Sequence, residues 1–388
     1  MSGSGFTGLL SAADWKKYLS EESGFKCLIS GPGALAREIE AVLGSSLSHI
    51  GVTSALHLAP DSLNSFETLA EESFMGVVLF GDDDRAASFY KYGYLKGSGK
   101  TALAISKGKE TGSESPEESG LRLPDGFFSG FLEERLSERV IRLILESVPS
   151  ALVRYMTACA VRDSEGRPTG DIAGLSERLV SLPSGEGSSH EELSSLDREF
   201  SEWAQSSGIS VPPEILLRLA FLYTRALEIS PDADVFSECR ERALSIYESI
   251  IARGCSDMAG ALARKKLGDL ILLFPASSNG GTENIERAEP LYREAFDMTE
   301  PGVHSRERSS ILNNLGLALA SLGVYIVSYD YIKAAAGSFA ASLSEGGEGF
   351  SAYEKAVVDF NLGAAYLALG EYRLSAEHLA PALEFYNQ

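Results

Sequence analysis

The sequence is short of positive charge. It holds 34 lysines and arginines against 55 aspartates and glutamates, which gives a net charge of −21 over 388 residues. A nucleic-acid-binding protein needs a basic surface to displace counterions from phosphates, and this composition does not supply one. The same deficit disfavours docking on anionic membranes. We therefore expect neither nucleic acid nor a membrane among the partners, and we read the acidity as a contribution to solubility.

Cysteine and long apolar runs are scarce as well. The four cysteines, none at CxxC spacing from another, are Cys27, Cys159, Cys239 and Cys255. This distribution argues against a disulfide frame and against a zinc knuckle. No run of about 18 apolar residues occurs, and the first residues lack the basic region that precedes the apolar core of a secretory signal. The expectation is a cytoplasmic protein with reduced thiols.

The first part of the chain alternates short apolar runs with helical patterns. Strand-like runs occupy residues 25–30, 49–59, 76–80 and 101–106, and helical patterns lie between them. This alternation is typical of a parallel sheet in an α/β domain. An amphipathic helix is predicted over residues 127–148, ended by Pro149.

The remaining residues read as helical, apart from a polar linker at 181–195. We divide the chain into a Rossmann-like α/β domain (1–150), a helical segment with linker (151–198) and an all-α domain (199–388). Two or three domains agree with the length of the chain.

An internal repeat is the strongest signal of the second half. A small residue directly preceded by leucine recurs at intervals of 48, 48 and 47, at Ala220, Gly268, Gly316 and Gly363. A second column pairs a small residue with a larger one four positions later. These pairs are Ala243–Tyr247, Ala288–Tyr292, Ala335–Phe339 and Ser375–Leu379. Such self-similarity predicts stacked copies of one helical hairpin.

The columns resemble those of tetratricopeptide repeats, whose first helix carries Leu-Gly-x-x-Tyr and whose second carries Ala-x-x-x-Phe-x-x-Ala. Residues 360–386 match best. The long period is similar to that of the extended repeats of kinesin light chains. The resemblance implies an all-α superhelix whose concave side binds a polypeptide. We expect the small column to let paired helices pack closely, and the large column to fill the gap between neighbouring hairpins.

The resemblance also implies binding residues. In that family, the residue before the Leu-Gly pair faces the groove and often bonds to the peptide backbone. The matching residues are Arg218, Lys266, Asn314 and Asn361, which Lys265 and Asn313 could join. Amides can pair with an extended backbone, and cations can pair with a carboxylate. The expected partner is a protein or peptide carrying acidic side chains or a C-terminal carboxylate. The alternatives are a solvated helix face, or an arc filled by the chain's own N-terminal part.

A glycine turn marks a candidate cofactor site in the first domain. Gly31, Gly33 and Ala36 fit G-x-G-x-x-A between a strand and a helix, where backbone N–H groups could hold a pyrophosphate. Asp61, after the second strand, could take a ribose hydroxyl pair, although it lies later than the usual acidic residue. The ligand would be NAD or another nucleotide. The alternative is a Rossmann-like module kept for its shape.

Residues 25–148 resemble part of the nucleotide-binding domains that regulate potassium channels and transporters, the RCK or KTN class. The resemblance rests on the strand that ends at GDDD and on residues 120–145, which would form a late strand and helix. The first of these makes Asp82 a candidate ligand contact. It implies a homodimer through this domain. The interval before GDDD is one strand–helix unit too short for the full fold. Asp82 to Asp84 could also hold Mg²⁺, or could simply cap a helix.

A catalytic constellation is not evident. Residues 97–101 (GSGKT) end like a P-loop, but they follow a helix rather than a strand. The five histidines are scattered, and His57 is expected to be packed in a strand. We therefore expect a scaffold or adaptor first, a nucleotide-responsive regulator second and an NAD(P)-dependent oxidoreductase third.

Overall fold

The protein is described by a computed structural model in two compact units, which meet within one helix at Leu222 and Tyr223. The described residues are 25–49, 52–58, 63–80, 85–107, 127–130, 138–163, 172–182, 190–229, 232–255, 258–273, 282–346 and 352–373. The first unit contains an α/β domain, and the second is helical, which agrees with the coarse expectation from the sequence. The predicted boundaries at 150 and 198 remain predictions.

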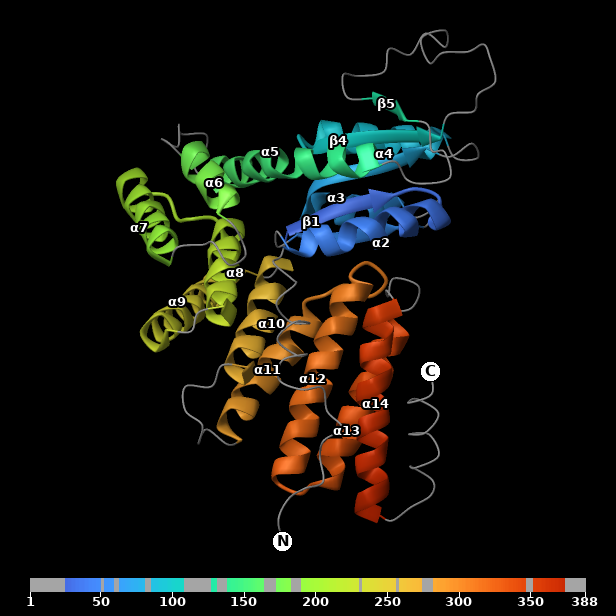
Figure 1. Ribbon diagram of the computed structural model, residues 1–388, viewed down its shortest axis with the longest axis vertical. Coiled ribbons are helices and arrows are strands. Elements are labelled where there is room, and N and C mark those ends of the chain that lie inside the picture. The colour runs from blue at the N-terminus through green and yellow to red at the C-terminus, as the bar shows by residue number, and fades with distance from the viewer. Residues whose placement is uncertain are drawn as a thin grey trace. The chain divides into compact units, whose positions relative to one another are not determined.

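A parallel sheet forms the centre of the first unit (Figure 1). Its order is β2-β1-β3-β4-β5, with β1 (Phe25–Ser30), β2 (Val52–His57), β3 (Ser73–Phe80), β4 (Thr101–Lys107) and β5 (Phe127–Gly130). The connecting helices are α2 (Gly33–His49), α3 (Leu63–Glu72) and α4 (Arg85–Gly97). Every residue of β1 and β3 is buried. Central parallel strands are covered on both faces, which explains why they read as continuous apolar runs.

Helix α2 contains Gly44, a residue type that often ends helices, in its second half. It continues through Gly44 to His49, because Leu43 and Leu47 keep its apolar face buried on both sides of the glycine. A glycine inside a helix costs about 1 kcal/mol relative to alanine, whereas burying one leucine side chain gains about 1.5–3 kcal/mol.

Helix α5 (Glu138–Asp163) corrects the predicted helix of residues 127–148 at both ends. Residues 127–130 form β5, parallel to β4, and Pro149 lies inside the helix. Ile144 and Val148 before the proline, and Leu152 and Met156 after it, are all buried. Their combined burial outweighs the cost of about 3 kcal/mol for an internal proline.

The segment after α5 is helical, as expected. It contains α6 (Ile172–Ser181), α7 (His190–Ser207) and α8 (Pro213–Ile229). Helix α7 begins inside the predicted linker 181–195. Its buried face of Leu193, Leu196 and Phe200 recurs at helical spacing, so the polar residues between them form its outer side rather than a linker.

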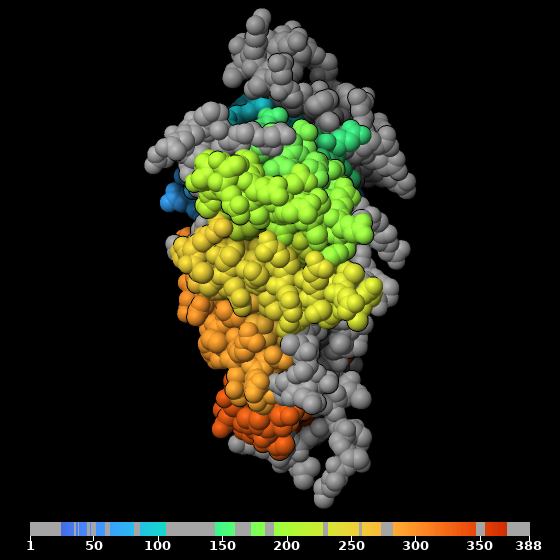
Figure 2. All heavy atoms as spheres, turned by 90° about the vertical axis from the view of Figure 1, so that its left-hand side faces the viewer, coloured from blue at the N-terminus to red at the C-terminus, as the bar shows by residue number. Residues whose placement is uncertain are grey.

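The second unit is a succession of helical hairpins, with no strand among its described residues. Its helices beyond α8 are α9 (Ala233–Ala252), α10 (Met258–Leu273), α11 (Glu283–Asp297), α12 (Ser305–Tyr325), α13 (Tyr329–Gly346) and α14 (Ala352–Arg373). Each packs against the next in chain order, and α12 also contacts α10 and α14. The surface of this unit follows the same order, passing from yellow to deep orange in Figure 2.

The two columns of the repeat meet inside two of the hairpins, α10–α11 and α12–α13. A Cβ added to Gly268 would lie 2.9 Å from the Tyr292 ring, and one added to Gly316 would lie 2.6 Å from the Phe339 ring. The large residue therefore packs on the glycine of its own hairpin, and not between hairpins as expected. Ser375 and Leu379 lie outside the described residues.

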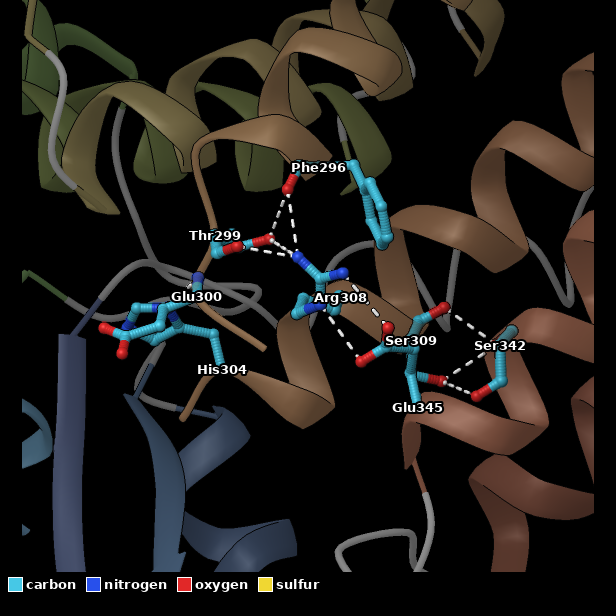
Figure 3. A network of polar contacts seen from close by, with 8 residues as sticks. All are labelled: Phe296, Thr299, Glu300, His304, Arg308, Ser309, Ser342 and Glu345. Carbon is cyan, nitrogen blue, oxygen red and sulfur yellow. Dashed lines mark hydrogen bonds and ion pairs between the residues drawn. The ribbon is translucent and has the colours of Figure 1, made fainter. Parts of the chain in front are cut away.

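A buried arginine joins three helices of this unit (Figure 3). Arg308 of α12 donates to the carbonyl oxygen of Thr299 at 2.6 Å and, through Nε and Nη2, to both oxygens of Glu345 at 3.0 Å. Its guanidinium stacks 3.9 Å from the centre of the Phe296 ring. Beside it, Ser309 and Ser342 each donate to the other's carbonyl oxygen at 2.8 Å. These contacts fix α12 against the end of α11 and against α13.

The turn between α12 and α13 is strained. Val327 has a φ of 57°, which a β-branched residue rarely adopts, and it is the one non-glycine residue with positive φ in the described chain. It follows the C-cap of α12, the position where helices commonly place glycine. Val327 is 72% exposed, with Tyr325 and Ile326 also exposed beside it. Packing therefore does not compensate the strain.

Replacing Val327 by glycine is expected to stabilise the helical unit by about 1 kcal/mol, because it relieves a left-handed valine that costs about 1–2 kcal/mol. Hydrogen exchange of α12 and α13 would detect the gain. Ile326, with a φ of −93°, provides the control: Ile326→Gly relieves no strain and should not stabilise. Equal effects of the two substitutions would contradict this account.

Candidate functional site

The predicted binding residues are buried. Arg218, Lys266, Asn314 and Asn361 are 2%, 7%, 0% and 0% exposed. This row is therefore not open to solvent in the structure, and the alternative of a solvated helix face is wrong. The last three residues lie on α10, α12 and α14, the first helices of successive hairpins, and α12 contacts both of the others. Arg218 belongs to the other unit and is not placed relative to them.

The two asparagines are linked by a chain of hydrogen bonds. Asn361 donates through Nδ2 to Oδ1 of Asn313 at 2.9 Å, and Asn313 donates to Oδ1 of Asn314 at 3.4 Å. Asn314 in turn donates to Oδ1 of Asp269 at 2.8 Å, and the Tyr292 hydroxyl donates to the same oxygen at 2.8 Å. We call these five residues, together with Lys265, Lys266 and Ser310, the polar row.

Asp269 is the centre of the polar row, and the sequence analysis missed it. Its Oδ2 lies 3.9 Å from Nζ of Lys265 and 3.8 Å from Nζ of Lys266. The lysines predicted to attract a partner's carboxylate therefore already face a carboxylate of their own helix. The available signal was spacing, because Asp269 follows the two lysines by four and three residues and so shares their helix face.

Three buried polar atoms of the row have no hydrogen-bond partner: Oδ2 of Asp269, Oγ of Ser310 and Oδ1 of Asn361. They are all the buried side-chain atoms in this condition in the described helical unit, residues 223–373. They sit on α10, α12 and α14, respectively. Buried polar groups are nearly always satisfied in folded proteins, and each exception calls for an explanation. Here the exceptions gather on one row of helices.

The phenol of Tyr292 is held in its donating form. Burial, reinforced by the neighbouring charge of Asp269, raises its pKa well above the ordinary value of 10.0. Burial likewise raises the pKa of Tyr247, the corresponding residue of the preceding hairpin. Both tyrosines therefore hold their protons more tightly in the folded state than in the unfolded state.

This shift predicts a loss of stability at alkaline pH. The contribution is intact below pH 10 and is lost as the pH rises above 10, by about 1.4 kcal/mol per pH unit for each tyrosine. Tyr292→Phe should remove one such contribution and flatten the fall, which urea unfolding at pH 8, 10 and 11 would measure. Tyr325→Phe, at an exposed ring, is the control. An unchanged slope for Tyr292→Phe would contradict the assignment.

Arg218 is a charged group deep in the first unit. Burial lowers the pKa of its guanidinium to about 10, and the group lies 5.4 Å from the centre of the Phe221 ring. It remains a cation at neutral pH. Because it belongs to the other unit, the members of the predicted set that the structure brings together are the last three.

The two glycines of the glycine turn differ in the space around them. A Cβ on Gly31 would overlap that of Leu79 at the end of β3 and lie 2.9 Å from the Leu79 carbonyl oxygen, so close packing explains this residue. A Cβ on Gly33 would meet no described atom within 4 Å. Ala36 is buried, and its N–H donates to the carbonyl oxygen of Pro32. The other predicted cofactor residues, Asp61 and Asp82, lie outside the described residues.

The glycine turn follows β1, the strand at which the order of strand addition reverses. From β1 the chain adds β2 on one side and then β3 and β4 on the other. In open parallel sheets, ligands bind outside the carboxyl ends of the strands at such a point. Among the described strands, β2 is the edge strand on this side of the sheet.

His57 ends β2 beside this turn. Its Nδ1 lies 3.2 Å from Oγ of Ser30 and its Nε2 lies 3.3 Å from Oγ of Ser65. The ring is buried and packs edge-on against Phe66, with centroids 5.4 Å apart. His57 is thus packed and bonded, as expected for a structural residue.

The GSGKT segment is a helix terminus. Gly99 has a φ of 72°, and the N–H of Lys100 donates to the carbonyl oxygen of Leu95, which closes α4. Nζ of Lys100 donates to the carbonyl oxygen of Glu71 and lies 4.4 Å from the centre of the Tyr155 ring. The lysine is committed to these contacts, and the segment precedes a strand rather than a helix, so it is not a P-loop.

Other kinds of site find little support in the described part of the chain. It contains no cluster of three or more histidine, cysteine or acidic side chains able to hold a metal ion. All four cysteines are free thiols. Among the described helices, none is long and apolar enough to cross a membrane.

Comparison with known proteins adds no assignment. No protein-family model matches the chain, and neither the curated proteins nor the solved structures show a significant match to it. The function therefore has to be argued from the polar row and the glycine turn themselves.

Proposed function

We propose that the second half of the chain is a tetratricopeptide-like array that binds another polypeptide, and that the protein serves as a cytoplasmic scaffold or adaptor. The repeat intervals and the ring-on-glycine contacts of Gly268 and Gly316 support the array. Stacked hairpins of this kind use the face of their first helices as an extended binding surface.

The observation that carries the proposal is the gathering, on α10, α12 and α14, of buried polar atoms that lack a hydrogen bond. A row kept only for packing gains nothing from such groups, because each costs about 1–3 kcal/mol while it lacks a partner. A bound polypeptide supplies N–H and C=O groups at regular intervals and can satisfy several of them at once. Since the row is buried in this structure, binding requires its polar groups to become exposed.

The proposal can be tested by presenting the immobilised protein with a displayed library of random octapeptides. We expect a family of mutually competing sequences to be enriched, and Asn314→Ala and Asn361→Ala to weaken their binding about tenfold. Lys333→Ala, at an exposed position of α13, serves as the control. Enrichment that is absent, or that survives both asparagine substitutions in folded protein, would defeat the proposal.

A second candidate is a nucleotide-responsive regulator whose α/β domain also forms a homodimer. Gly33 favours it, because this residue begins α2 beside the point where the strand order reverses, and a Cβ added there would meet no described atom within 4 Å. Thermal shift with NAD, NADP and ATP provides the test, with Gly33→Glu filling that space. A shift lost in the variant supports the regulator, and no shift with any nucleotide counts against it.

A further inference from the structure

We infer that the polar row selects a ligand that donates hydrogen bonds, namely the main-chain N–H groups of an extended polypeptide, and not the carboxylate expected from its lysines. The inference rests on the proposed function and gives its ligand a chemistry. It follows from the direction in which the hydrogen bonds of the row run.

Asp269 sets that direction. A carboxylate accepts hydrogen bonds and does not donate them, so the group of Asn314 that faces it is the amide nitrogen. The oxygen of Asn314 is then turned to Asn313, and the oxygen of Asn313 is turned to Asn361. Each amide fixes the next, and the chain ends with the oxygen of Asn361 directed at no donor.

The two ends of the chain are therefore both acceptors. Oδ1 of Asn361 on α14 and Oδ2 of Asp269 on α10 lack hydrogen bonds, while the hydroxyl of Ser310 on α12 can accept or donate. Groups that only accept are satisfied by N–H or O–H donors. A partner's carboxylate would place further acceptors against them.

The lysines do not restore a site for an anion. Nζ of Lys265 and Nζ of Lys266 both lie within 4 Å of the Asp269 carboxylate, so an incoming anion would compete with an intramolecular one. The ammonium groups and the carboxylate are also nearly fully buried, which keeps this arrangement in place. The overall charge of −21 adds a repulsion of its own.

The size of the row suits an extended segment. Packed helices lie about 8–10 Å apart, so α10 and α14 on either side of α12 are separated by about 20 Å. An extended chain advances about 3.3 Å per residue, and its N–H groups face one side at every second residue. Six residues therefore cover about 20 Å and turn three N–H groups to one side, one for each helix.

The experiment uses the full chain and immobilised synthetic hexapeptides drawn from the sequences that the random library enriches. Each sequence is made with a free carboxylate, with a C-terminal amide and with alternate backbone nitrogens methylated. We expect amidation to leave the affinity unchanged and backbone methylation to weaken binding at least tenfold. A requirement for the free carboxylate or for acidic side chains would overturn the inference while leaving the proposed function standing. Failure of every sequence to bind would overturn both.

Asp269→Asn tests whether the carboxylate of Asp269 sets the ligand preference of the polar row. The asparagine keeps the shape but removes the charge opposite two ammonium groups, so the variant should gain affinity for acidic hexapeptides, by about tenfold, and lose its indifference to the C-terminal carboxylate. Asp330→Asn changes the charge equally at an exposed site of α13 and should alter neither. Unaltered preference in folded Asp269→Asn would also overturn the inference.

A second variant, Asn361→Leu, serves if Asp269→Asn does not fold. It removes the terminal acceptor and should weaken the binding of the amidated hexapeptides about tenfold. Undiminished binding would count against the inference.

Discussion

Replacing Arg308 by alanine is expected to destabilise the helical unit by about 2–4 kcal/mol. The substitution removes both bonds to Glu345 and the bonds to the carbonyl oxygens of Thr299 and Phe296. It also empties the space above the Phe296 ring. Breaking a buried ion pair from one side is costly because the remaining charge and carbonyl groups stay desolvated. Glu345 is 26% exposed, so water can solvate part of its charge, and we expect a smaller destabilisation than for fully buried pairs.

The effect should be local enough to be seen by hydrogen exchange, with protection lost first in α12 and α13. A matched control is Arg293→Ala, which removes an exposed arginine from an ion pair with Glu289 within α11. Exposed pairs of this kind contribute about 0.3–0.5 kcal/mol. Similar losses for the two variants would show that the three-helix contact of Arg308 carries no special weight.

The sheet was largely predictable from sequence because its central strands are buried on both faces. The run at residues 25–30 coincides with β1, and the runs at 76–80 and 101–106 fall within β3 and β4. Helix ends were less predictable. Gly44 and Pro149 are local stop signals, and they were overridden by apolar contacts that only the folded chain makes.

The close packing of paired helices was predictable for a similar reason, since one contact recurs in two successive hairpins. A glycine under an aromatic ring leaves a paired mark in the sequence at Gly268 with Tyr292 and at Gly316 with Phe339. Sequence alone could not tell whether the ring lies within a hairpin or between hairpins. Both arrangements have the same spacing along the chain, and only the three-dimensional contact distinguishes them.

The candidate site was predicted by position but not by chemistry. Asn314, Asn361 and Lys266 do lie on contacting helices, yet the hydrogen bonds between them pass through Asn313 and Asp269. Burial and hydrogen-bond direction depend on long-range packing, which the spacing of residues along one chain does not encode. The expectation of an acidic partner rested on Arg218 and Lys266 and did not take into account Asp269, one turn further along the helix of Lys266.

The contact of Gly316 with the Phe339 ring predicts a large effect of substituting this glycine. In an open helix position, Gly→Ala stabilises by up to about 1 kcal/mol, because alanine has the higher helix propensity. At Gly316 the added methyl would lie 2.6 Å from the Phe339 ring, and overpacking of this kind typically costs about 1–3 kcal/mol. Gly316→Ala should therefore destabilise the unit, whereas Gly337→Ala in α13, where a Cβ meets no described atom within 4 Å, should stabilise it.

A double-substitution cycle assigns the cost to the pair. Phe339→Leu alone leaves a gap beneath the smaller side chain and should be destabilising, while Gly316→Ala partly fills that gap in the combined variant. The double variant should thus be more stable than the sum of the single changes by about 1 kcal/mol or more, because residues in contact do not behave additively. Urea unfolding of the four proteins measures this coupling. Strict additivity would mean that the glycine and the aromatic ring are not in contact, and that the recurring column of small residues has some other cause than the close packing of paired helices.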